Sequence, residues 1–254
     1  MKYIISSYAL YHQPIEKAIY TLLEQGWKKI EIMCEGHGYE LLSWNEQKCK
    51  QLLDLLLKHQ AKVQFHLPIH KFNPASCDPI VIKETEDIWN KCIKLAKYFH
   101  SDYLLCHPGR SSDHQKGLTN IQDFFNKKYN EIPENTFLLL ENVPPYKYEI
   151  GATSDDLLTI LSAIDKDKVG LCFDTGHAYL ASKGQFVEEL LALKEFIKGF
   201  HINDNHGMKD EHLALGDGEI PFDFILELIK EKEYYINFEM KKIEYVNQSV
   251  KRFP

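Results

Sequence analysis

Histidine and carboxylate residues stand at the ends of six mostly hydrophobic segments of this chain. The six residues are His66, His107, Glu141, Asp174, His201 and Glu239. Serine, asparagine or lysine would cap such segments equally well, so the uniform choice of imidazole and carboxylate favours a metal centre. Because the set contains no thiolate, it suits Zn²⁺, Mn²⁺, Co²⁺ or Fe²⁺ better than Ca²⁺ or Mg²⁺.

The segments that end in these residues have the composition of buried parallel strands. We expect strands at residues 3–7, 29–33, 63–66, 103–107, 137–141, 169–174, 199–201 and 235–239. Amphipathic patterns between them predict helices at residues 14–25, 45–59, 79–99, 118–131, 154–164, 185–196 and 222–232.

Strands that alternate with helices predict a parallel sheet covered by helices. Eight strands in a chain of 254 residues indicate an α/β fold of the closed (β/α)8, or TIM, barrel type, which typically has about 250 residues. The eighth helix has to come from the tail after Glu239, so we expect a short or irregular last helix. An open doubly wound sheet is the alternative, but no G-x-G-x-x-G motif follows the first strand. Without a linker or repeat, residues 1–254 are expected to form one domain.

Composition and charge exclude several other classes of protein. Charged residues make up 26% and hydrophobic residues 44% of the chain, which are ordinary globular values. The excess of 37 acidic over 30 basic residues argues against nonspecific binding to nucleic acid. No apolar run approaches the roughly 20 residues of a membrane span, and we expect no signal peptide before the first strand. The six cysteines form no CxxC pair, so we expect reduced thiols in a cytoplasmic protein.

Further metal-ligand residues follow two of the strand ends. His177 lies three residues after Asp174, and the long loop after His201 adds Asp210 and His212. Barrel enzymes carry their chemistry at the C-terminal ends of the strands. All of these side chains are therefore expected to meet at one mouth of the barrel.

Positively charged residues near this mouth are candidates for binding a substrate. The chain has two arginines, and Arg110 directly follows His107-Pro108-Gly109. Arg110 is a candidate clamp for a phosphate or carboxylate, and an ion pair with Asp113 is the alternative. Lys71 and Lys209 are further candidates, for which a solvated surface position is the alternative.

Five short motifs occur in order at successive strand ends. They are His107-Pro108-Gly109, Glu141-Asn142, Asp174-Thr175-Gly176-His177, His201-Ile202-Asn203-Asp204, and Asp210-Glu211-His212 followed by Leu215-Gly216-Asp217-Gly218. In this order they resemble the xylose isomerase-like TIM barrels, and the resemblance runs from the first strand to Glu239. That superfamily includes sugar isomerases and epimerases and also endonuclease IV.

The resemblance implies two different ligand sets. The epimerase members hold one divalent ion with residues at the places of Glu141, Asp174, His201 and Glu239. Endonuclease IV holds three zinc ions with nine ligands, and all nine have counterparts here. These counterparts are His66, His107, Glu141, Asp174, His177, His201, Asp210, His212 and Glu239. We therefore expect one to three divalent transition-metal ions as the cofactor.

The chain departs from endonuclease IV in the parts that contact DNA. Val143-Pro144-Pro145 follows the Glu-Asn motif where that enzyme has a glycine-containing turn, and Ile69 stands where it has an aromatic wedge. Residues 34–44 contain no lysine or arginine, although contacts to the DNA backbone and minor groove need such groups. Residues 26–32 instead resemble the second strand of the isomerase members.

These features favour a metal-dependent isomerase or epimerase of a small sugar or sugar phosphate. The metal would stabilise an enediolate. Glu141 and Glu239 would be the catalytic residues that exchange the carbon-bound proton. His107 and His177 would bind substrate hydroxyls or a second ion.

The alternative is a zinc phosphodiesterase of the endonuclease IV type, an apurinic/apyrimidinic endonuclease with three ions. In that enzyme Glu141 would bridge two ions and orient a hydroxide. Only the phosphodiesterase hypothesis predicts nucleic acid as a partner. Neither the isomerase nor the phosphodiesterase hypothesis predicts binding to a membrane. A third hypothesis is a barrel that binds metal or sugar without catalysis. The sequence does not indicate an oligomeric state.

Overall fold

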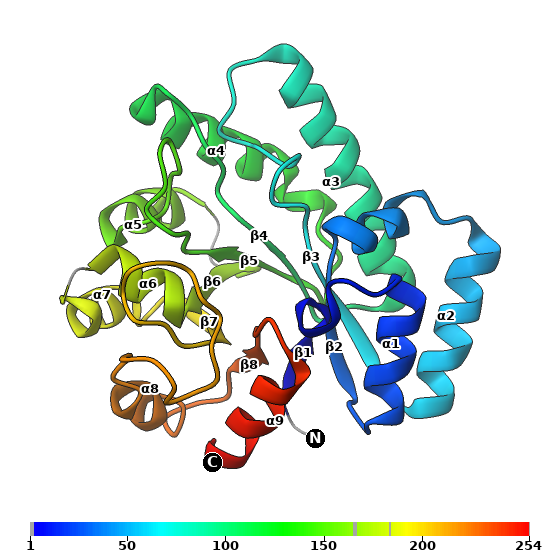
Figure 1. Ribbon diagram of the computed structural model, residues 1–254. Helices are drawn as coiled ribbons and strands as arrows, with labels where there is room; N and C mark the ends of the chain where they lie inside the picture. Colours follow the sequence, from blue (N-terminus) through cyan, green and yellow to red (C-terminus); the bar gives the residue numbers. More distant parts are fainter. Residues whose placement is uncertain (1–2, 165–166, 183, 254) are drawn as a thin grey trace.

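The computed structural model, which describes residues 3–164, 167–182 and 184–253, contains a closed parallel barrel. Its strands pair in chain order, and β8 pairs with β1 to close the barrel (Figure 1). The strands are β1 (Ile4–Ser6), β2 (Lys29–Met33), β3 (Lys62–His66), β4 (Tyr103–Cys106), β5 (Phe137–Glu141), β6 (Val169–Asp174), β7 (Ile197–Ile202) and β8 (Tyr235–Phe238). The (β/α)8 barrel predicted from the sequence is thus confirmed.

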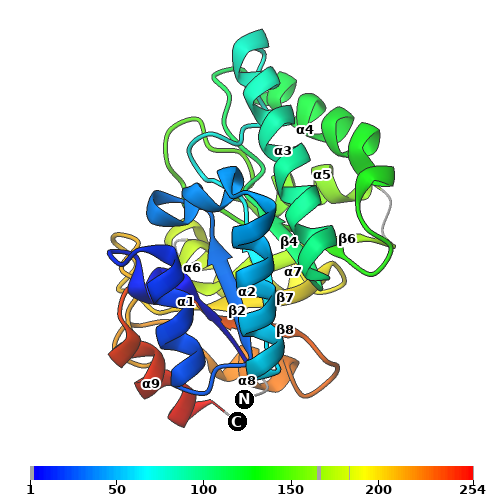
Figure 2. The same cartoon turned by 90° about the vertical axis from the view of Figure 1, so that its right-hand side faces the viewer.

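Helices surround the barrel on the outside (Figures 1 and 2). They are α1 (Ile15–Glu24), α2 (Glu46–His59), α3 (Pro79–Phe99), α4 (His114–Lys128), α5 (Ser154–Ser162), α6 (Thr175–Ser182), α7 (Phe186–Leu193), α8 (Asp223–Leu228) and α9 (Ile243–Arg252). Short 3-10 helices lie at η1 (Ser7–Leu10), η2 (Gly36–Ser43) and η3 (Tyr129–Glu131). Side chains cap several N-termini: Asn45 accepts from the backbone N–H of Lys48, and Thr153 accepts from that of Asp156.

Two helices differ from the expectation. The tail after β8 forms α9, a regular helix of 10 residues, rather than a short or irregular one. The sequence pattern also missed α6, because an amphipathic pattern requires one solvent-exposed side. Gly176, His177 and Ala178 are all buried in α6, so its hydrophobic residues do not recur at helical spacing.

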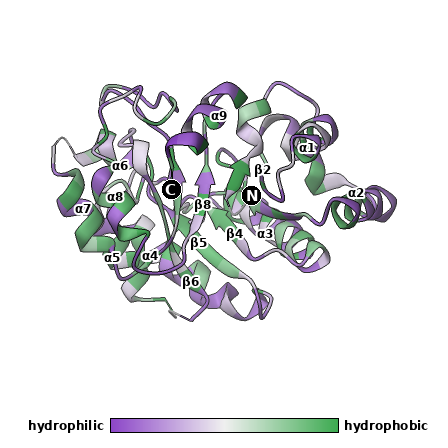
Figure 3. Cartoon of the chain, turned by 90° about the horizontal axis from the view of Figure 1, so that it is seen from below, coloured by the Kyte–Doolittle hydropathy of each residue, from purple (hydrophilic) through white to green (hydrophobic). Residues whose placement is uncertain are grey.

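The hydrophobic core lies in two layers. The barrel interior contains Ile4, Tyr103, Leu105, Leu139 and Cys172. A larger cluster fills the space between the strands and the surrounding helices. Figure 3 shows hydrophobic residues along β4 and β5, where both faces of the strand are covered.

The two ends of the described chain meet at the barrel wall. The ring of Tyr3 packs edge-on against Phe238 and against Phe253, with 5.6 Å between centroids in each case. This contact holds α9 beside the N-terminal strand, and Figure 2 shows α9 near the first helix. In the described residues, no helix has the length and apolar character needed to cross a membrane.

Candidate metal centre

The C-terminal ends of the strands surround a cavity of about 540 Å³. The predicted site residues along its wall are His66, His107, Arg110, His177, Asp210, His212 and Glu239. Glu141, Asp174 and His201 are fully buried against these residues. The structure thus brings together all nine of the predicted ligand residues, and it divides them into three groups.

The first group consists of Glu141, Asp174, His201 and Glu239, whose ligand atoms all lie within 4.8 Å of one another. Nδ1 of His201 lies 2.9 Å from Oε1 of Glu141 and 3.1 Å from Oε2 of Glu239. Oδ2 of Asp174 lies 3.9 Å from the same nitrogen. Three carboxylates and one imidazole therefore lie close enough together to share one ion.

The second group consists of His66, His107 and Glu141. Oε2 of Glu141 lies 3.1 Å from Nε2 of His66 and 3.2 Å from Nε2 of His107. Since Oε1 of the same carboxylate faces His201, the two oxygens of Glu141 face two different groups.

The third group consists of His177, Asp210 and His212. Oδ2 of Asp210 lies 3.3 Å from Nε2 of His177 and 3.0 Å from Nε2 of His212. Oδ1 of Asp210 is buried without a hydrogen-bond partner. An unsatisfied buried carboxylate oxygen is costly, and a cation held by this group would satisfy it.

A buried aspartate organises the loop that carries Asp210 and His212. Oδ2 of Asp204 accepts hydrogen bonds from the backbone N–H groups of Gly216 (2.8 Å) and Gly218 (3.0 Å). Oδ1 accepts from the N–H of Ile220, at 3.2 Å. A Cβ at Gly218 would lie 2.4 Å from Oδ1 of Asp204, so glycine is required at this close approach. The Asn-Asp and Leu-Gly-Asp-Gly motifs therefore position the third group.

Backbone carbonyls orient three of the histidines. Nδ1 of His66 donates to the carbonyl of Leu67 at 2.8 Å, and Nδ1 of His212 donates to that of Glu239, also at 2.8 Å. Nδ1 of His177 donates to the carbonyl of Asn142 at 2.9 Å. Because a carbonyl can only accept, each Nδ1 carries a proton and each Nε2 is directed at its group.

The electrostatics of the site indicate that it is built for cations. Burial opposes charge on Glu141, but His201, His107 and His66 hold the pKa of its carboxyl well below its usual range. Burial raises the pKa of Asp174 to about 6. Burial disfavours a charged His212, yet Asp210 and Glu239 raise the pKa of its imidazole to about 9.

The ligand residues therefore fit a divalent metal. The histidines face the carboxylates at hydrogen-bond distance, and divalent cations would replace protons in these contacts. The donor set of imidazole and carboxylate is typical of Zn²⁺, Mn²⁺, Co²⁺ or Fe²⁺.

The three basic residues expected to bind substrate lie in different surroundings. Arg110 lines the cavity, where Nη2 donates to the carbonyl of His70 at 2.9 Å. Nη1 lies 3.8 Å from Oε1 of Glu149, so the pairing partner is Glu149 rather than Asp113.

The two lysines do not line the cavity. Nζ of Lys71 lies 3.9 Å from Glu84 and over the ring of Tyr39. The side chain of Lys209 is 74% exposed and lies 3.8 Å from Glu211. The cavity wall instead includes Lys241, two residues after Glu239.

Sequence reasoning missed two further parts of the site. Tyr8, in η1, lines the cavity, and its ring lies 4.9 Å from that of His212. Burial, with Glu239 and Asp210 nearby, raises the pKa of Tyr8 to about 12. Glu31 is fully buried within β2. In the sequence, the only indication of this part of the site was a charged residue between two isoleucines, Ile30 and Ile32, within a predicted buried strand.

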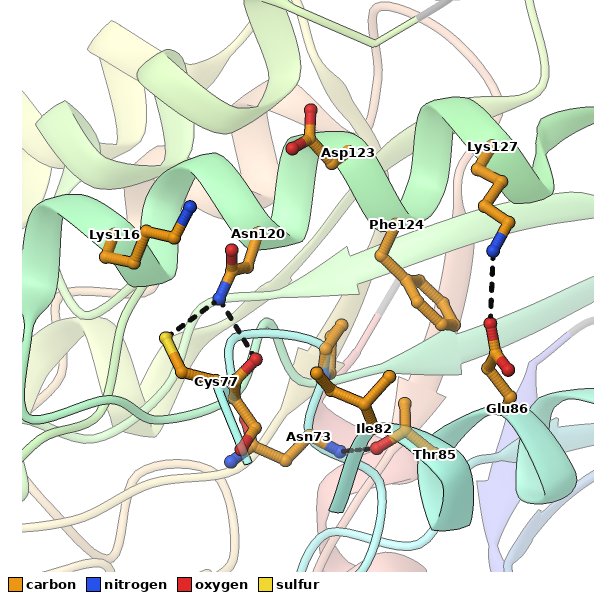
Figure 4. A pocket seen from close by; sticks show the side chains of 12 residues that line it. Asn73, Cys77, Ile82, Thr85, Glu86, Lys116, Asn120, Asp123, Phe124 and Lys127 are labelled. Carbon is orange, nitrogen blue, oxygen red and sulfur yellow. Dashed lines mark hydrogen bonds and ion pairs between the residues drawn. The ribbon is translucent and has the colours of Figure 1, made fainter. Parts of the chain in front are cut away.

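A second hollow lies outside the barrel, between α3 and α4 (Figure 4). Nδ2 of Asn120 lies 3.3 Å from Sγ of Cys77, and Nζ of Lys127 lies 3.3 Å from Glu86. The residues along this hollow include none of the nine ligand residues. The candidate ligand residues thus lie at the mouth cavity and not at this hollow.

The fold and the site define an α/β barrel with three groups of metal-ligand side chains at its mouth. The family described as xylose isomerase-like TIM barrel matches residues 19–253. The chain belongs to this family, as its motifs predicted.

Its relatives carry different names. Uncharacterized protein MJ1311 of Methanocaldococcus jannaschii is 30% identical over 262 residues, which cover 96% of this chain and 85% of that protein. A probable endonuclease 4 of Persephonella marina is 28% identical over 198 residues, which cover 71% of this chain and 67% of that protein. A solved structure described as a D-tagatose 3-epimerase-like protein is 28% identical with a TM-score of 0.86, covering 99% of this chain and 95% of that one.

Proposed function

We propose that the protein is a divalent-metal-dependent hydrolase of small phosphate esters, with a centre that holds three ions. The observation that carries this proposal is the position of Glu141 between two ligand groups, 2.9 Å from His201 and 3.1 Å from His66. A centre for one ion needs four ligands, and it does not require the groups around His107 and Asp210. Closely spaced divalent ions, when bound, supply a water of lowered pKa and neutralise charge on the phosphoryl group.

The protein residues have separate roles in this reaction. Glu141 would hold ions in both the first and the second group, and Asp210 with His177 and His212 would hold the third ion. Arg110 and Lys241 at the wall bind the phosphate oxygens. In the reaction, water adds to phosphorus, the ester P–O bond breaks, and the alcohol leaves with a proton.

The cavity favours a small ester over duplex DNA. Among the described residues along its wall, Arg110 and Lys241 are the lysine and arginine side chains. Binding of a DNA backbone requires a row of such contacts. Tyr11, Ile69 and Tyr146 also line the cavity and would pack against the organic part of the ester.

The test uses purified protein that has been depleted of metal and reloaded with Zn²⁺, Mn²⁺ or Co²⁺. We expect hydrolysis of bis-p-nitrophenyl phosphate or p-nitrophenyl phosphate, and weak or no cleavage of an abasic-site oligonucleotide at low salt. Glu141→Gln should lower the rate at least ~100-fold, whereas the exposed Glu40→Gln should not change it. Wild-type protein that binds three ions and hydrolyses no ester would reject the proposal.

A sugar isomerase or epimerase is the second candidate, favoured by the first ligand group. Glu141 and Glu239 both lie within 3.1 Å of His201 and are buried, and in this reaction they would be the groups that remove and return the carbon-bound proton. The name of the D-tagatose 3-epimerase-like relative supports the same reaction. Exchange of a ketose carbon-bound proton with D₂O, at one ion per chain, would favour this candidate over the hydrolase.

A further inference from the structure

A fully buried carboxylate lies beneath the metal centre and contacts one of its histidines. Glu31, in β2, is 0% exposed. Its Oε2 lies 3.2 Å from Nε2 of His201 and accepts a hydrogen bond from the hydroxyl of Tyr103 at 2.8 Å. Its Oε1 accepts from Nδ2 of Asn237, also at 2.8 Å. Side chains from four strands thus meet at Glu31 inside the barrel.

His201 differs from the other oriented histidines in two ways. His66, His177 and His212 direct Nε2 at their groups and donate through Nδ1 to backbone carbonyls. His201 directs Nδ1 at Glu141 and Glu239, and its Nε2 faces a side-chain carboxylate. An ionised carboxylate can only accept, so it keeps the proton on Nε2 and leaves Nδ1 for the ligand group.

We propose that Glu31 is a positioning residue for the metal centre, acting through His201. It holds the imidazole in one tautomer and one orientation, and its negative charge strengthens Nδ1 as a ligand. This inference rests on the metal centre of the proposed function.

Two observations distinguish this role from mere filling of the barrel. Burying a carboxylate is costly unless it is paired and hydrogen-bonded, and a leucine or methionine would fill the same space more cheaply. Glu31 also does not belong to the wall of the mouth cavity. Its direct contact with the ligand residues is the one with His201.

Glu31→Gln is the most informative variant, because glutamine keeps the volume and removes the charge. Its carbonyl oxygen can accept from His201 and Tyr103 as Oε2 does. Oδ1 of Asn237 is buried without a partner in the native arrangement. If the side-chain amide of Asn237 rotates by about half a turn, this oxygen can accept a hydrogen bond from the amide of the new glutamine. We therefore expect the variant to fold.

The experiment titrates metal-free protein with Zn²⁺ against a competing chelator and with Co²⁺, whose visible bands report the ligand geometry. We expect Glu31→Gln to weaken the binding of one ion by ~10–100-fold and to change its Co²⁺ bands. Tyr103→Phe removes one donor to Glu31 and should have a smaller effect in the same direction. Ser101→Ala removes a buried hydrogen bond to the carbonyl of Val63, 2.8 Å long, and should bind metal like the wild type.

Thermal melting of the metal-free variants controls for folding. Wild-type affinity and wild-type Co²⁺ bands in a folded Glu31→Gln protein would overturn the inference, as would equal weakening of every ion. A wild-type protein that binds no metal would overturn both this inference and the proposed hydrolase. A wild type that binds metal without hydrolysing esters would reject the hydrolase alone, and the titration would still decide the role of Glu31.

Discussion

Oδ2 of Asp210 lies 3.0 Å from Nε2 of His212, two residues further along the same loop. The φ angle of His212 is 48°, a left-handed conformation that residues other than glycine rarely adopt. Backbone strain of this kind persists where the surrounding structure demands it, and it gathers at functional sites. Two members of the third ligand group, Asp210 and His212, are thus carried by a strained loop, whereas His177 lies in α6, directly after β6.

Removal of the third group should change the number of bound ions without unfolding the barrel. We expect Asp210→Asn and His212→Ala each to lower the metal content by one ion per chain, because each removes a ligand from a group of three. Elemental analysis of protein purified without chelator measures this. Lys209→Ala, at an exposed neighbouring position, should keep the wild-type content. Unchanged metal content in both ligand variants would contradict a third ion.

Asp204 should be essential for the loop that carries this group. Asp204→Asn leaves one acceptor oxygen where the aspartate satisfies the N–H groups of Gly216, Gly218 and Ile220. We expect the free energy of unfolding to fall by about 1–3 kcal/mol, as measured by urea denaturation of metal-free protein. We also expect the variant to lose one bound ion. The control is Asp217→Asn in the same loop, whose carboxylate pairs with Gln248 at the surface. A wild-type denaturation midpoint for Asp204→Asn would show that water replaces these bonds.

Glu35 should make the stability depend on pH. Burial opposes its charge. The backbone N–H of His70 (3.1 Å), the imidazole of His70 (3.2 Å) and the backbone N–H of Ile69 (2.9 Å) together lower its pKa below the ordinary value of 4.5. A group whose pKa is lowered on folding stabilises the protein above its unfolded pKa, and this stability is lost as the pH falls through the folded pKa.

The test compares wild type with Glu35→Gln by urea unfolding of metal-free protein between pH 7 and pH 3. We expect the wild type to be more stable by about 1 kcal/mol at pH 7, and the difference to shrink as the pH falls below about 4.5. Glu40→Gln, at an exposed position of η2, should show no such trend. A difference that grows toward low pH would contradict the assigned direction of the shift.

Arg110 should affect substrate binding more than turnover. Its guanidinium lines the cavity but lies outside the three ligand groups, so Arg110→Ala should raise KM for a phosphate ester by roughly 10-fold while kcat changes little. Arg110→Lys should recover only part of this loss, because lysine cannot bind phosphate with two parallel hydrogen bonds. Steady-state kinetics with the reloaded protein measure both constants. A loss confined to kcat would instead place Arg110 in the chemical step.

Local sequence patterns determined most of the fold. Apolar segments ending in His66, His107, Glu141 or Asp174 indicated buried parallel strands, and the number of such strands favoured a (β/α)8 barrel over an open doubly wound sheet. The same pattern predicted that the candidate ligand residues lie close together, because barrel topology brings the C-terminal ends of all strands to one mouth.

Tertiary structure decided the rest, because it depends on contacts between residues far apart in the sequence. The division of nine ligands into three groups depends on which carboxylate oxygen faces which histidine, as at Glu141. Local patterns could not show α6, which is buried on most of its surface, or Glu31, whose partners lie 72, 170 and 206 residues away. A buried polar side chain such as Glu31 acquires a chemical role only in the closed barrel. There, water is excluded and the side chain forms its hydrogen bonds with other protein groups.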